Sequence, residues 1–274
     1  MLYVVTTPIG NLEDLSARAL RVLGEVDLVA AEDTRATRAL LTRHGLATPL
    51  TSYFEHNKLA KLDSILERAT IGDVALVSEA GTPGISDPGY ELIAAAIDRG
   101  IRVVPVPGPV ALVTALAVSG LPTDQFVYLG FLPRKSGDRR RRLESIARQP
   151  RTIVAYEAPH RLLDCLDDVA AVLGDRRVAI ARELTKLYEE VRRGTVSEVR
   201  AHFAATPPRG EITLVVAGAP EEAAPPDDLV DRILAELAAA GIDDKNVPGA
   251  LARATGLPRR DLYRRWTELR STDS

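Results

Sequence analysis

Several features that mark other classes of protein are scarce or absent in this 274-residue sequence. Cys165 is the only cysteine, so the chain can form no internal disulfide and cannot build a thiolate-rich zinc or iron–sulfur site by itself. No apolar run approaches the ~20 residues that a membrane helix requires. We therefore expect a protein of a reducing, cytoplasmic setting that has no membrane partner.

An excess of charge is also lacking, because 35 lysines and arginines stand against 38 aspartates and glutamates, for a formal net charge of -3. A chain coated in basic charge is thereby excluded, and any contact with nucleic acid must be local. The histidines His44, His56 and His202 show no metal-ligand spacing, and no H-E-x-x-H motif occurs. We expect no metal site.

What the sequence does contain is typical of a folded α/β protein. Hydrophobic residues make up 46% and charged residues 27%, near the globular average, and the length suggests about two domains. In the first half, short β-branched runs alternate with longer segments whose apolar residues recur every three or four positions, which indicates a mostly parallel sheet flanked by helices. The expected strands are residues 2–6, 26–31, 74–78 and 103–106. The expected helices are residues 15–23, 34–44, 59–69, 90–99 and 110–118.

A second series follows, with expected strands at residues 126–130, 153–156, 178–181 and 212–217 and helical segments between them. We place the joint at residues 119–123, where Gly120 is soon followed by Pro122. Residues 1–120 and 121–219 are thus expected to form two consecutive α/β domains. A small helical domain, residues 220–274, is expected to follow after a linker rich in proline, alanine and glutamate. Its expected helices are residues 229–240, 247–255 and 261–269.

Clusters of turn-forming and polar residues follow the expected strands of the first half, where open α/β sheets bind their ligands. They are residues 6–11, 31–35, 78–89 and 105–109. The first also fits a simple turn, the fourth also fits a helix start, and capping by Asp33 or Thr34 explains part of the second. Residues 78–89 are the most informative, because three glycines and two prolines shape a loop whose backbone can wrap a ligand. A P-loop is excluded, since no Gly-Lys-Ser or Gly-Lys-Thr follows.

A basic segment, residues 134–142, carries six basic residues in nine positions of a chain that is otherwise acidic. Contact with phosphates is the functional interpretation, and a solvated, arginine-rich helix face is the alternative. The segment directly follows Phe131-Leu132-Pro133, at the expected ligand cleft, and this placement favours RNA. The arginines expected to bind RNA are Arg134, Arg139, Arg140, Arg141 and Arg142.

Taken in order along the chain, the motifs resemble the tetrapyrrole methylase superfamily and, more closely, the bacterial ribosomal RNA small subunit methyltransferase I family. The resemblance covers nearly the whole chain, and its strings are weak individually but highly specific together. One departure is Glu79, where the family more often has aspartate. The matching strings are Thr7-Pro8-Ile9-Gly10-Asn11-Leu12, Ala31-Glu32-Asp33-Thr34-Arg35, Ala80-Gly81-Thr82-Pro83, Ile85-Ser86-Asp87-Pro88-Gly89, Phe131-Leu132-Pro133 with Lys135, Tyr156-Glu157-Ala158-Pro159-His160-Arg161, Arg182-Glu183-Leu184-Thr185-Lys186 and Gly210-Glu211-Ile212.

The resemblance implies a two-domain α/β methyltransferase that holds S-adenosylmethionine in the cleft between its domains and works as a homodimer. Its implied product is a 2′-O-methylated cytidine in the 16S rRNA of the small ribosomal subunit. The residues that match the superfamily's cofactor pocket are Pro8, Ala80, Gly81, Thr82, Ile85, Val110, Ala111, Glu157, Leu184 and Ile212.

Methyl transfer from a sulfonium to a ribose hydroxyl is an in-line displacement, so alignment supplies much of the rate, and a nearby side chain can accept the hydroxyl proton. The candidate catalytic residues are Asn11, Asp33, Arg35 and Lys135, with Lys186 as the reserve base. Two other interpretations remain open. One is a tetrapyrrole or other small-molecule methylase, against which the basic segment and the C-terminal helices favour rRNA. The other is a catalytically inactive RNA-binding or ribosome-assembly protein, against which the polar strand ends argue.

Overall fold

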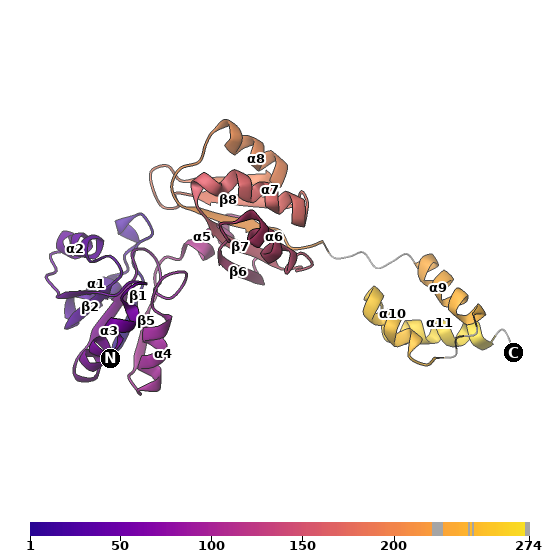
Figure 1. Ribbon diagram of the computed structural model, residues 1–274, viewed down its shortest axis with the longest axis horizontal. Helices are drawn as coiled ribbons and strands as arrows, with labels where there is room; N and C mark the ends of the chain where they lie inside the picture. The colour runs from indigo at the N-terminus through magenta and orange to yellow at the C-terminus, as the bar shows by residue number, and fades with distance from the viewer. Residues whose placement is uncertain (221–226, 241, 243, 272–274) are drawn as a thin grey trace. The chain divides into compact units, whose positions relative to one another are not determined.

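The computed structural model describes residues 1–220, 227–240, 242 and 244–271. The chain divides into two compact units, unit 1 over Met1–Ala219 and unit 2 over Pro220–Ser274. Unit 1 holds two five-stranded sheets, one built from strands β1–β5 in its N-terminal half and one from β6–β10 in its second half. Figure 1 labels these elements along the chain. The expected fold class, two consecutive α/β parts with a helical C-terminal end, is confirmed.

The N-terminal half is built on a parallel sheet with the strand order β3-β2-β4-β1-β5. Its strands are β1 (Leu2–Val5), β2 (Leu28–Ala31), β3 (Leu50–Ser52), β4 (Val74–Val77) and β5 (Val103–Val106). β4 is buried along its whole length, as expected for a central strand that is covered on both faces. β5 lies at the edge, where the sheet tolerates Pro105, whose missing N–H would interrupt the ladder of a central strand.

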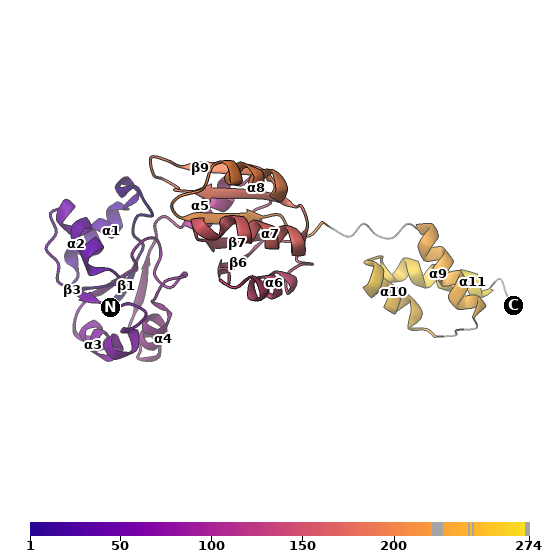
Figure 2. The same ribbon diagram turned by 45° about the horizontal axis from the view of Figure 1, so that its top comes forward.

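Helices cover both faces of this sheet, because alternate residues of each strand point to opposite sides. Val74 and Leu76 of β4 join the core beneath α3 and α4, whereas Ala75 and Val77 join the core beneath α1 and α2. Figure 2 shows the two helix pairs on opposite sides of the sheet. The helices are α1 (Ala17–Glu25), α2 (Thr34–Arg43), α3 (Lys58–Ile71) and α4 (Tyr90–Asp98), and a short 3-10 helix, η1 (Leu12–Asp14), follows β1.

The second half has a mixed sheet with the strand order β6-β7-β10-β8-β9. Its strands are β6 (Phe126–Phe131), β7 (Thr152–Glu157), β8 (Arg177–Arg182), β9 (Glu190–Thr195) and β10 (Ile212–Val216). β6 and β7 run parallel, while β10 runs antiparallel to both of its neighbours and β9 runs antiparallel to β8. The start of β10 therefore lies beside the ends of β7 and β8, and Ile212 pairs with both Glu157 and Arg182.

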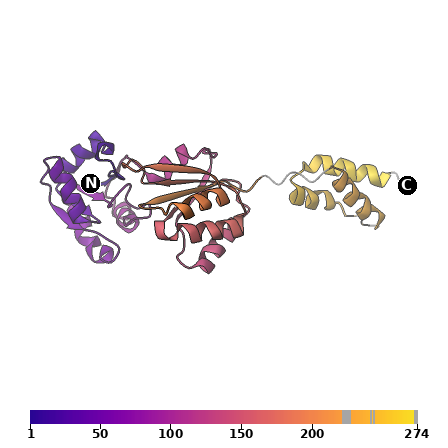
Figure 3. The ribbon, with the colours of Figure 1, turned by 90° about the horizontal axis from the view of Figure 1, so that it is seen from above.

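Helices from two parts of the chain cover this second sheet. α6 (Ser136–Glu144), α7 (Leu162–Leu173) and α8 (Val196–Ala205) enclose one core, in which Cys165 is buried. α5 (Ala111–Val118) packs Leu112, Ala115 and Leu116 into a separate core with the same sheet. Figure 3 shows the magenta α5 on one side of the strands and the red α6 and α7 on the other. α5 thus packs on the second sheet, although it precedes the joint expected at residues 119–123.

The expected strands and helices of unit 1 are found within a few residues of their predicted positions, and β5 matches at both ends. Two edge strands, β3 and β9, were not expected. β3 has only three residues, and β9 carries Glu190, Arg192 and Arg193 at the outer edge of its sheet. Charged side chains protect an edge strand from pairing with other chains, but they also remove the alternation of apolar residues that predicts a strand.

Unit 2 consists of α9 (Asp227–Ala239), α10 (Val247–Thr255) and α11 (Arg259–Ser271). These helices enclose a core of Val230, Leu234, Leu262 and Trp266, which confirms the three expected helices. The expected linker falls largely on residues 221–226, which lie outside the described residues. In the part of the chain that the structure describes, no helix has both the length and the apolar character needed to cross a membrane.

Trp266 is the only tryptophan in the chain, so its fluorescence reports on unit 2 alone. Leu262→Ala removes a fully buried side chain from the same core and is expected to lower the free energy of unfolding of unit 2 by about 2–5 kcal/mol. Urea unfolding followed by tryptophan fluorescence should shift to lower urea, whereas the far-UV circular dichroism transition of unit 1 should stay in place. Leu229→Ala, at a 41% exposed position of α9, is the control. Equal shifts of both transitions would contradict separate cores.

Candidate functional site

Unit 1 contains a cavity of about 490 Å3, called the pocket below, to which both halves contribute. Its volume lies in the range of ~300–1,000 Å3 that is typical of small-molecule sites. The loops after β1, β4 and β5 and the first residue of α5 contribute Ile9, Glu79, Ala80, Gly81, Thr82, Ile85, Ser86, Asp87, Val110 and Ala111. The second half contributes Phe131, Tyr156, Glu157, Ala158, Pro159, Ala181, Leu184, Gly210, Glu211, Ile212 and Thr213.

The first side of the pocket forms because the carboxyl ends of the parallel strands β1, β4 and β5 meet at one edge of their sheet. Thr7 and Gly81 join the first two loops through reciprocal backbone hydrogen bonds of 2.9 and 3.1 Å. The hydroxyls of Thr6 and Thr82 add a contact of 3.0 Å. Gly81 has a φ of 76°, a left-handed conformation that strains any residue with a β-carbon. Position 81 therefore favours glycine because of its backbone conformation.

The second side of the pocket comes from the ends of β7 and β8 and from the start of β10, which the antiparallel pairing of β10 brings together. Hydrogen bonds tie this side to the first. The hydroxyl of Tyr156 accepts a hydrogen bond from the N–H of Leu112 at 3.2 Å, at the start of α5. The hydroxyls of Ser86 and Tyr128 lie 2.5 Å apart and link the loop after β4 to the second sheet. Both halves thus hold the pocket in shape.

The charged groups that line the pocket are acidic. They are the carboxylates of Glu79, Asp87, Glu157 and Glu211, and among the described residues no lysine or arginine lines the pocket. Burial raises the pKa of Asp87 to about 7, and the negative charges of Glu32 and Glu79 add to the rise. The pocket therefore disfavours an anionic ligand, and it contains a carboxyl group that exchanges its proton near neutral pH.

Glu157 is nearly fully buried, with 1% of its surface exposed. Its Oε1 pairs with the guanidinium of Arg161 and accepts a hydrogen bond from the N–H of Ala158 at 2.8 Å. Its Oε2 is buried without a hydrogen-bond partner among the described residues. Burial, together with the charge of Glu157, raises the pKa of the Cys165 thiol. Glu157 thus anchors the end of β7 to the turn that follows it.

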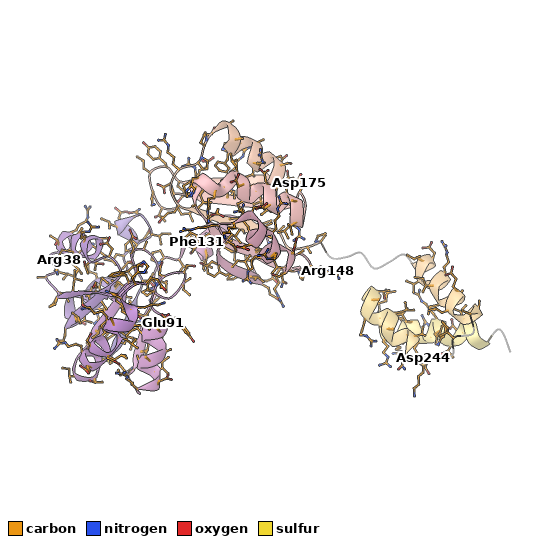
Figure 4. The ribbon with its side chains drawn as sticks, in the orientation of Figure 1. Arg38, Glu91, Phe131, Arg148, Asp175 and Asp244 are labelled. Atoms are coloured by element: carbon orange, nitrogen blue, oxygen red, sulfur yellow. The ribbon has the colours of Figure 1, made fainter. Side chains whose placement is uncertain are left out.

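The structure does not bring the expected catalytic residues together, and none of them lines the pocket. Asp33 caps α2, and its Oδ1 accepts the N–H groups of Arg35 and Ala36 at 2.7 and 3.1 Å. These hydrogen bonds hold the pKa of Asp33 below its usual range. Arg35 is exposed and lines a separate, shallow hollow with Arg38. Figure 4 shows Arg38 on the opposite side of the N-terminal half from the pocket residue Phe131.

Asn11 and Lys186 lie in neighbouring loops, because the N–H of Asn11 donates a hydrogen bond to the hydroxyl of Thr185 at 3.1 Å. The side chain of Asn11 caps η1. The Nζ of Lys186 lies 3.0 Å from carboxylate oxygens of both Glu183 and Glu211. Burial alone would lower the pKa of Lys186, but the hydrogen bonds to these carboxylates outweigh burial and raise it. Lys186 is therefore held as a cation, which does not suit the role of reserve base.

Within the basic segment, Arg139 is buried against α7. Its Nε donates to Oδ2 of Asp168 at 2.7 Å, and both side chains are 3% exposed. Arg140 and Ser136 donate to Oδ1 of the same carboxylate at 2.6 and 2.9 Å. Burial alone would raise the pKa of Asp168, but these hydrogen bonds outweigh it and lower the pKa. The expectation that Arg139 contacts RNA is corrected, because its guanidinium fixes α6 to α7.

The other basic residues of this segment differ in whether an ion pair within the protein already engages them. Arg141 pairs with Asp138 on the same helix, and Arg140 shares Asp168, although both arginines are exposed. Arg134, Lys135 and Arg142 are exposed and make no ion pair with any described residue. The free cations thus lie at the two ends of the segment.

Every expected cofactor residue except Pro8 lines the pocket, and Ile9 lines it in place of Pro8. Most of the lining residues that were not expected lie within the motif strings or beside them, so their position along the chain is the signal that finds them. Ala181 and Thr213 lie inside strands, directly before the string at residues 182–186 and directly after the string at residues 210–212. The unexpected lining residues are Ile9, Glu79, Ser86, Asp87, Phe131, Tyr156, Ala158, Pro159, Ala181, Gly210, Glu211 and Thr213.

The chain is similar to a known protein family and to several named proteins. The family described as Tetrapyrrole (Corrin/Porphyrin) Methylases matches residues 1–200. The chain is 47% identical to Ribosomal RNA small subunit methyltransferase I of Synechocystis sp. over 98% of each chain. It is 47% identical to the protein of that name from Escherichia coli O157:H7, over 96% of this chain and 93% of the relative. A Thermotoga maritima protein of the same name is 50% identical over 218 residues, which are 79% of this chain and 98% of the relative.

Solved structures of methyltransferases are similar in fold to most of this chain. The methyltransferase CobJ has a TM-score of 0.60 at 19% sequence identity. A uroporphyrin-III-C-methyltransferase from Thermus thermophilus has a TM-score of 0.54 at 22% identity. Each similarity covers 80% of this chain and 94% of the solved chain. At these identities the likeness concerns the fold alone.

The raised pKa of Asp87 predicts how stability depends on pH. Its carboxyl has a pKa of about 7 in the fold, against an ordinary value of 3.8. Between these values the folded chain binds more protons than the unfolded chain, so this group makes stability fall as the pH rises. Asp87→Asn is expected to stabilise the chain at pH 8 by about 1–2 kcal/mol, after allowance for solvent screening, and to have less effect at pH 5. Urea unfolding at both pH values measures the difference.

Asp175→Asn is the matched control, because hydrogen bonds from Ser197 lower the pKa of that exposed carboxyl. Its effect should have the opposite sign, with stability lost at pH 8. Figure 4 shows Asp175 in the second half, away from the pocket residue Phe131. If Asp87→Asn destabilised the chain equally at pH 5 and pH 8, the carboxyl would be ionised throughout and its assigned environment would be wrong.

Proposed function

The chain belongs to the tetrapyrrole methylase family and, within it, to the ribosomal RNA small subunit methyltransferase I family, and from this membership we propose that it methylates small-subunit rRNA with S-adenosylmethionine. We propose the 2′-O position of a cytidine in 16S rRNA as the acceptor, and a cytoplasmic homodimer as the working form. The observation that carries the proposal is the acidic and apolar pocket of unit 1.

When bound, S-adenosylmethionine supplies an electrophilic methyl group on a cationic sulfonium. The pocket suits such a ligand, because Glu79 and Asp87 line it and form no ion pair with any described residue, whereas Glu211 is paired with Lys186. The loop from Ala80 to Ile85 presents backbone groups, and its neighbours present apolar surface that an adenine ring can contact. The residues proposed to hold the cofactor are Ile9 in place of Pro8, Ala80, Gly81, Thr82, Ile85, Val110, Ala111, Glu157, Leu184 and Ile212.

Among the groups that line the pocket, Asp87 is best suited to accept the proton that a ribose hydroxyl must lose. A carboxyl with a pKa of about 7 is part ionised at neutral pH and can take up a proton and release it again. Lys186 is held as a cation, and Asp33 is engaged as a helix cap outside the pocket. We therefore assign the base to a carboxylate oxygen of Asp87.

Contacts with the RNA backbone are assigned to exposed cations outside the pocket. Arg134, Lys135 and Arg142 are exposed at the start and on the helix of the basic segment. Phosphate contacts of this kind position a nucleic acid without reading its sequence. In this assignment Lys135 acts on the substrate backbone and takes no part in proton transfer.

Unit 2 is proposed to add substrate contacts and to leave the pocket to unit 1. The Thermotoga relative aligns over 98% of its own length with 79% of this chain, so a protein of that name is shorter than this chain. In unit 2 the guanidinium groups of Arg253 and Arg259 converge over α10, at 3.8 and 3.6 Å from the site where a β-carbon on Gly249 would stand. Two converging cations offer a place for a phosphate.

A small-molecule methylase is the alternative that the fold leaves open, because the solved structures of similar fold include a uroporphyrin-III-C-methyltransferase. Identity separates the two alternatives. Named rRNA methyltransferases share 47% of residues over nearly the whole chain, whereas that solved enzyme shares 22%. A catalytically inactive RNA-binding protein is disfavoured by a pocket whose lining keeps the expected cofactor residues.

Transfer of tritium from labelled S-adenosylmethionine tests the proposal. Small ribosomal subunits from a bacterial strain that lacks the enzyme should accept label, and digestion to nucleosides should place it in 2′-O-methylcytidine. Uroporphyrinogen offered in parallel should remain unlabelled. Label on a base, label in the tetrapyrrole, or no transfer to assembled subunits would each overturn the assigned acceptor.

Gly81→Val tests the pocket itself. At a φ of 76° valine is strained, and its β-carbon would stand 3.4 Å from Cγ2 of Ile9, inside the loop that is proposed to hold the cofactor. Calorimetric affinity for S-adenosylmethionine is expected to fall by about 10-fold or more, since a displaced loop loses several contacts. Gly100→Val is the matched control, because Gly100 has a φ of 69° with nothing within 4 Å and lies outside the pocket. Equal affinity in the two variants would remove this loop from the cofactor site.

A further inference from the structure

We propose that the ring of Phe131 stacks on the base of the acceptor nucleotide, and that Arg134 and Lys135 contact the phosphates beside it. The proposal rests on the proposed function and names how the same site takes hold of its RNA. Phe131 is the last residue of β6, lines the pocket and is 59% exposed. Figure 4 shows it where the two halves of unit 1 meet.

The backbone turns Phe131 towards the pocket through a β-bulge. Tyr128 pairs with Val154, and the next regular pair is Phe131 with Tyr156, so β6 contains one residue more than β7 in this interval. Without the extra residue Phe131 would face the opposite side of the sheet from Tyr128, because side chains alternate. Gly130, with a φ of 66°, makes the irregular step possible. The strand is thus bent at the residue that brings an aromatic ring to the pocket.

The side chain of Phe131 makes an aromatic contact with Tyr156, while 59% of the residue stays exposed. It packs on Tyr156 with a centroid distance of 5.4 Å, and Tyr156 packs edge-on against Tyr128 at 5.4 Å. Hydrogen bonds fix the two tyrosines, since Tyr156 accepts from Leu112 and Tyr128 meets Ser86. An aromatic cluster with an exposed outer ring is suited to receive one more planar ring.

Free cations lie next to this ring. Pro133 separates Phe131 and Leu132 from Arg134 and Lys135, which are exposed and form no ion pair with a described residue. The arginines on the following helix that could compete for a phosphate are mostly engaged with carboxylates, as for Arg139 with Asp168. An aromatic face beside free cations is the combination that proteins use to hold an unstacked nucleotide.

The acceptor nucleotide must leave its stack for its 2′-hydroxyl to reach a methyl group inside a pocket. A stacking surface at the edge of the pocket offsets part of the lost base stacking. Asp87 lines the same pocket, so the ribose attached to a base on Phe131 would lie on the side of the carboxylate that accepts its proton. The arrangement explains why a large apolar ring is left exposed at this position.

Phe131→Leu tests the stacking role, with Phe131→Trp as the rescue variant that keeps an aromatic face. For Phe131→Leu the KM for small ribosomal subunits is expected to rise by about 10-fold, whereas the Kd for S-adenosylmethionine changes less than about twofold. Phe131→Trp should retain a KM close to that of the wild type. Phe126→Leu is the matched control, because Phe126 begins the same strand, is 40% exposed and lies outside the pocket lining.

A second readout uses the fluorescence of the Phe131→Trp variant, from which the signal of the wild type, with Trp266 alone, is subtracted. Addition of subunits should quench the new tryptophan, as expected for a base stacked on it, and S-adenosylmethionine alone should not. Replacing Arg134 and Lys135 by glutamine should reduce the slope of log KM against log salt.

Three results would overturn the proposal. In the first, Phe131→Leu weakens the binding of S-adenosylmethionine instead of subunits, which would place the ring on the cofactor. In the second, the variant changes the oligomeric state by sedimentation, which would place the ring against a second copy. In the third, KM is unchanged while the wild type methylates subunits normally, so the stacking proposal fails and the proposed function stands. Absence of methylation by the wild type would instead refute the proposed function.

Discussion

The reciprocal backbone hydrogen bonds between Thr7 and Gly81 are the constraint on which the rest of the site depends. β1 and β4 are parallel neighbours, and their chains would separate after the last ladder bond of the sheet. The bridge keeps the two loops paired beyond the sheet and requires a left-handed residue at position 81. It thereby fixes Ile9 opposite the loop of Ala80–Ile85 and gives that loop a defined inner surface. The hydroxyl contact of Ser86 with Tyr128 then closes the loop onto the second sheet.

Negative and positive charges occupy different places in unit 1, although the net charge of the chain is only -3. Carboxylates line the pocket, and the free cations of the basic segment lie outside it. A cationic methyl donor and a polyanionic acceptor make opposite demands on a protein, and one surface cannot satisfy both at short range. The end of β6 lies at the pocket, and the free cations follow it just before and within α6. Each ligand can therefore contact groups of the opposite charge.

Much of the fold could be predicted from the sequence, because its signals are local, whereas most of the expected pocket residues came from the resemblance to the family. The glycines and prolines in residues 78–89 predict a loop of defined shape, and the spacing of apolar residues predicts nearly every helix. The prediction that the catalytic residues form one cluster was wrong for a physical reason. Asp33 stands at a helix start, where capping explains a carboxylate, and Glu211, which helps to hold Lys186 as a cation, lies just before β10 and 25 residues further along the chain. The antiparallel direction of β10 is likewise not encoded in the residues of that strand.

Helical phase could have separated the buried arginine from the exposed ones. Arg139 and the buried Leu143 are four residues apart and share a helix face, which places Arg139 towards the core. The exposure of Phe131, by contrast, depends on the bulge between β6 and β7, and β6 has no alternation of apolar and polar residues in which an extra residue could be recognised. The pairing register of the strands therefore determines those parts of the site that sequence patterns do not predict.

The central claim is that the pocket joining the two halves of unit 1 binds the methyl donor. A crystal structure of the full chain grown with S-adenosylmethionine tests it most directly. The account predicts density for the ligand against Gly81 and Ile85 on one side and against Leu184 and Ile212 on the other, with the sulfonium close to the carboxylates. Density at another site, with this pocket filled only by water, would contradict the account.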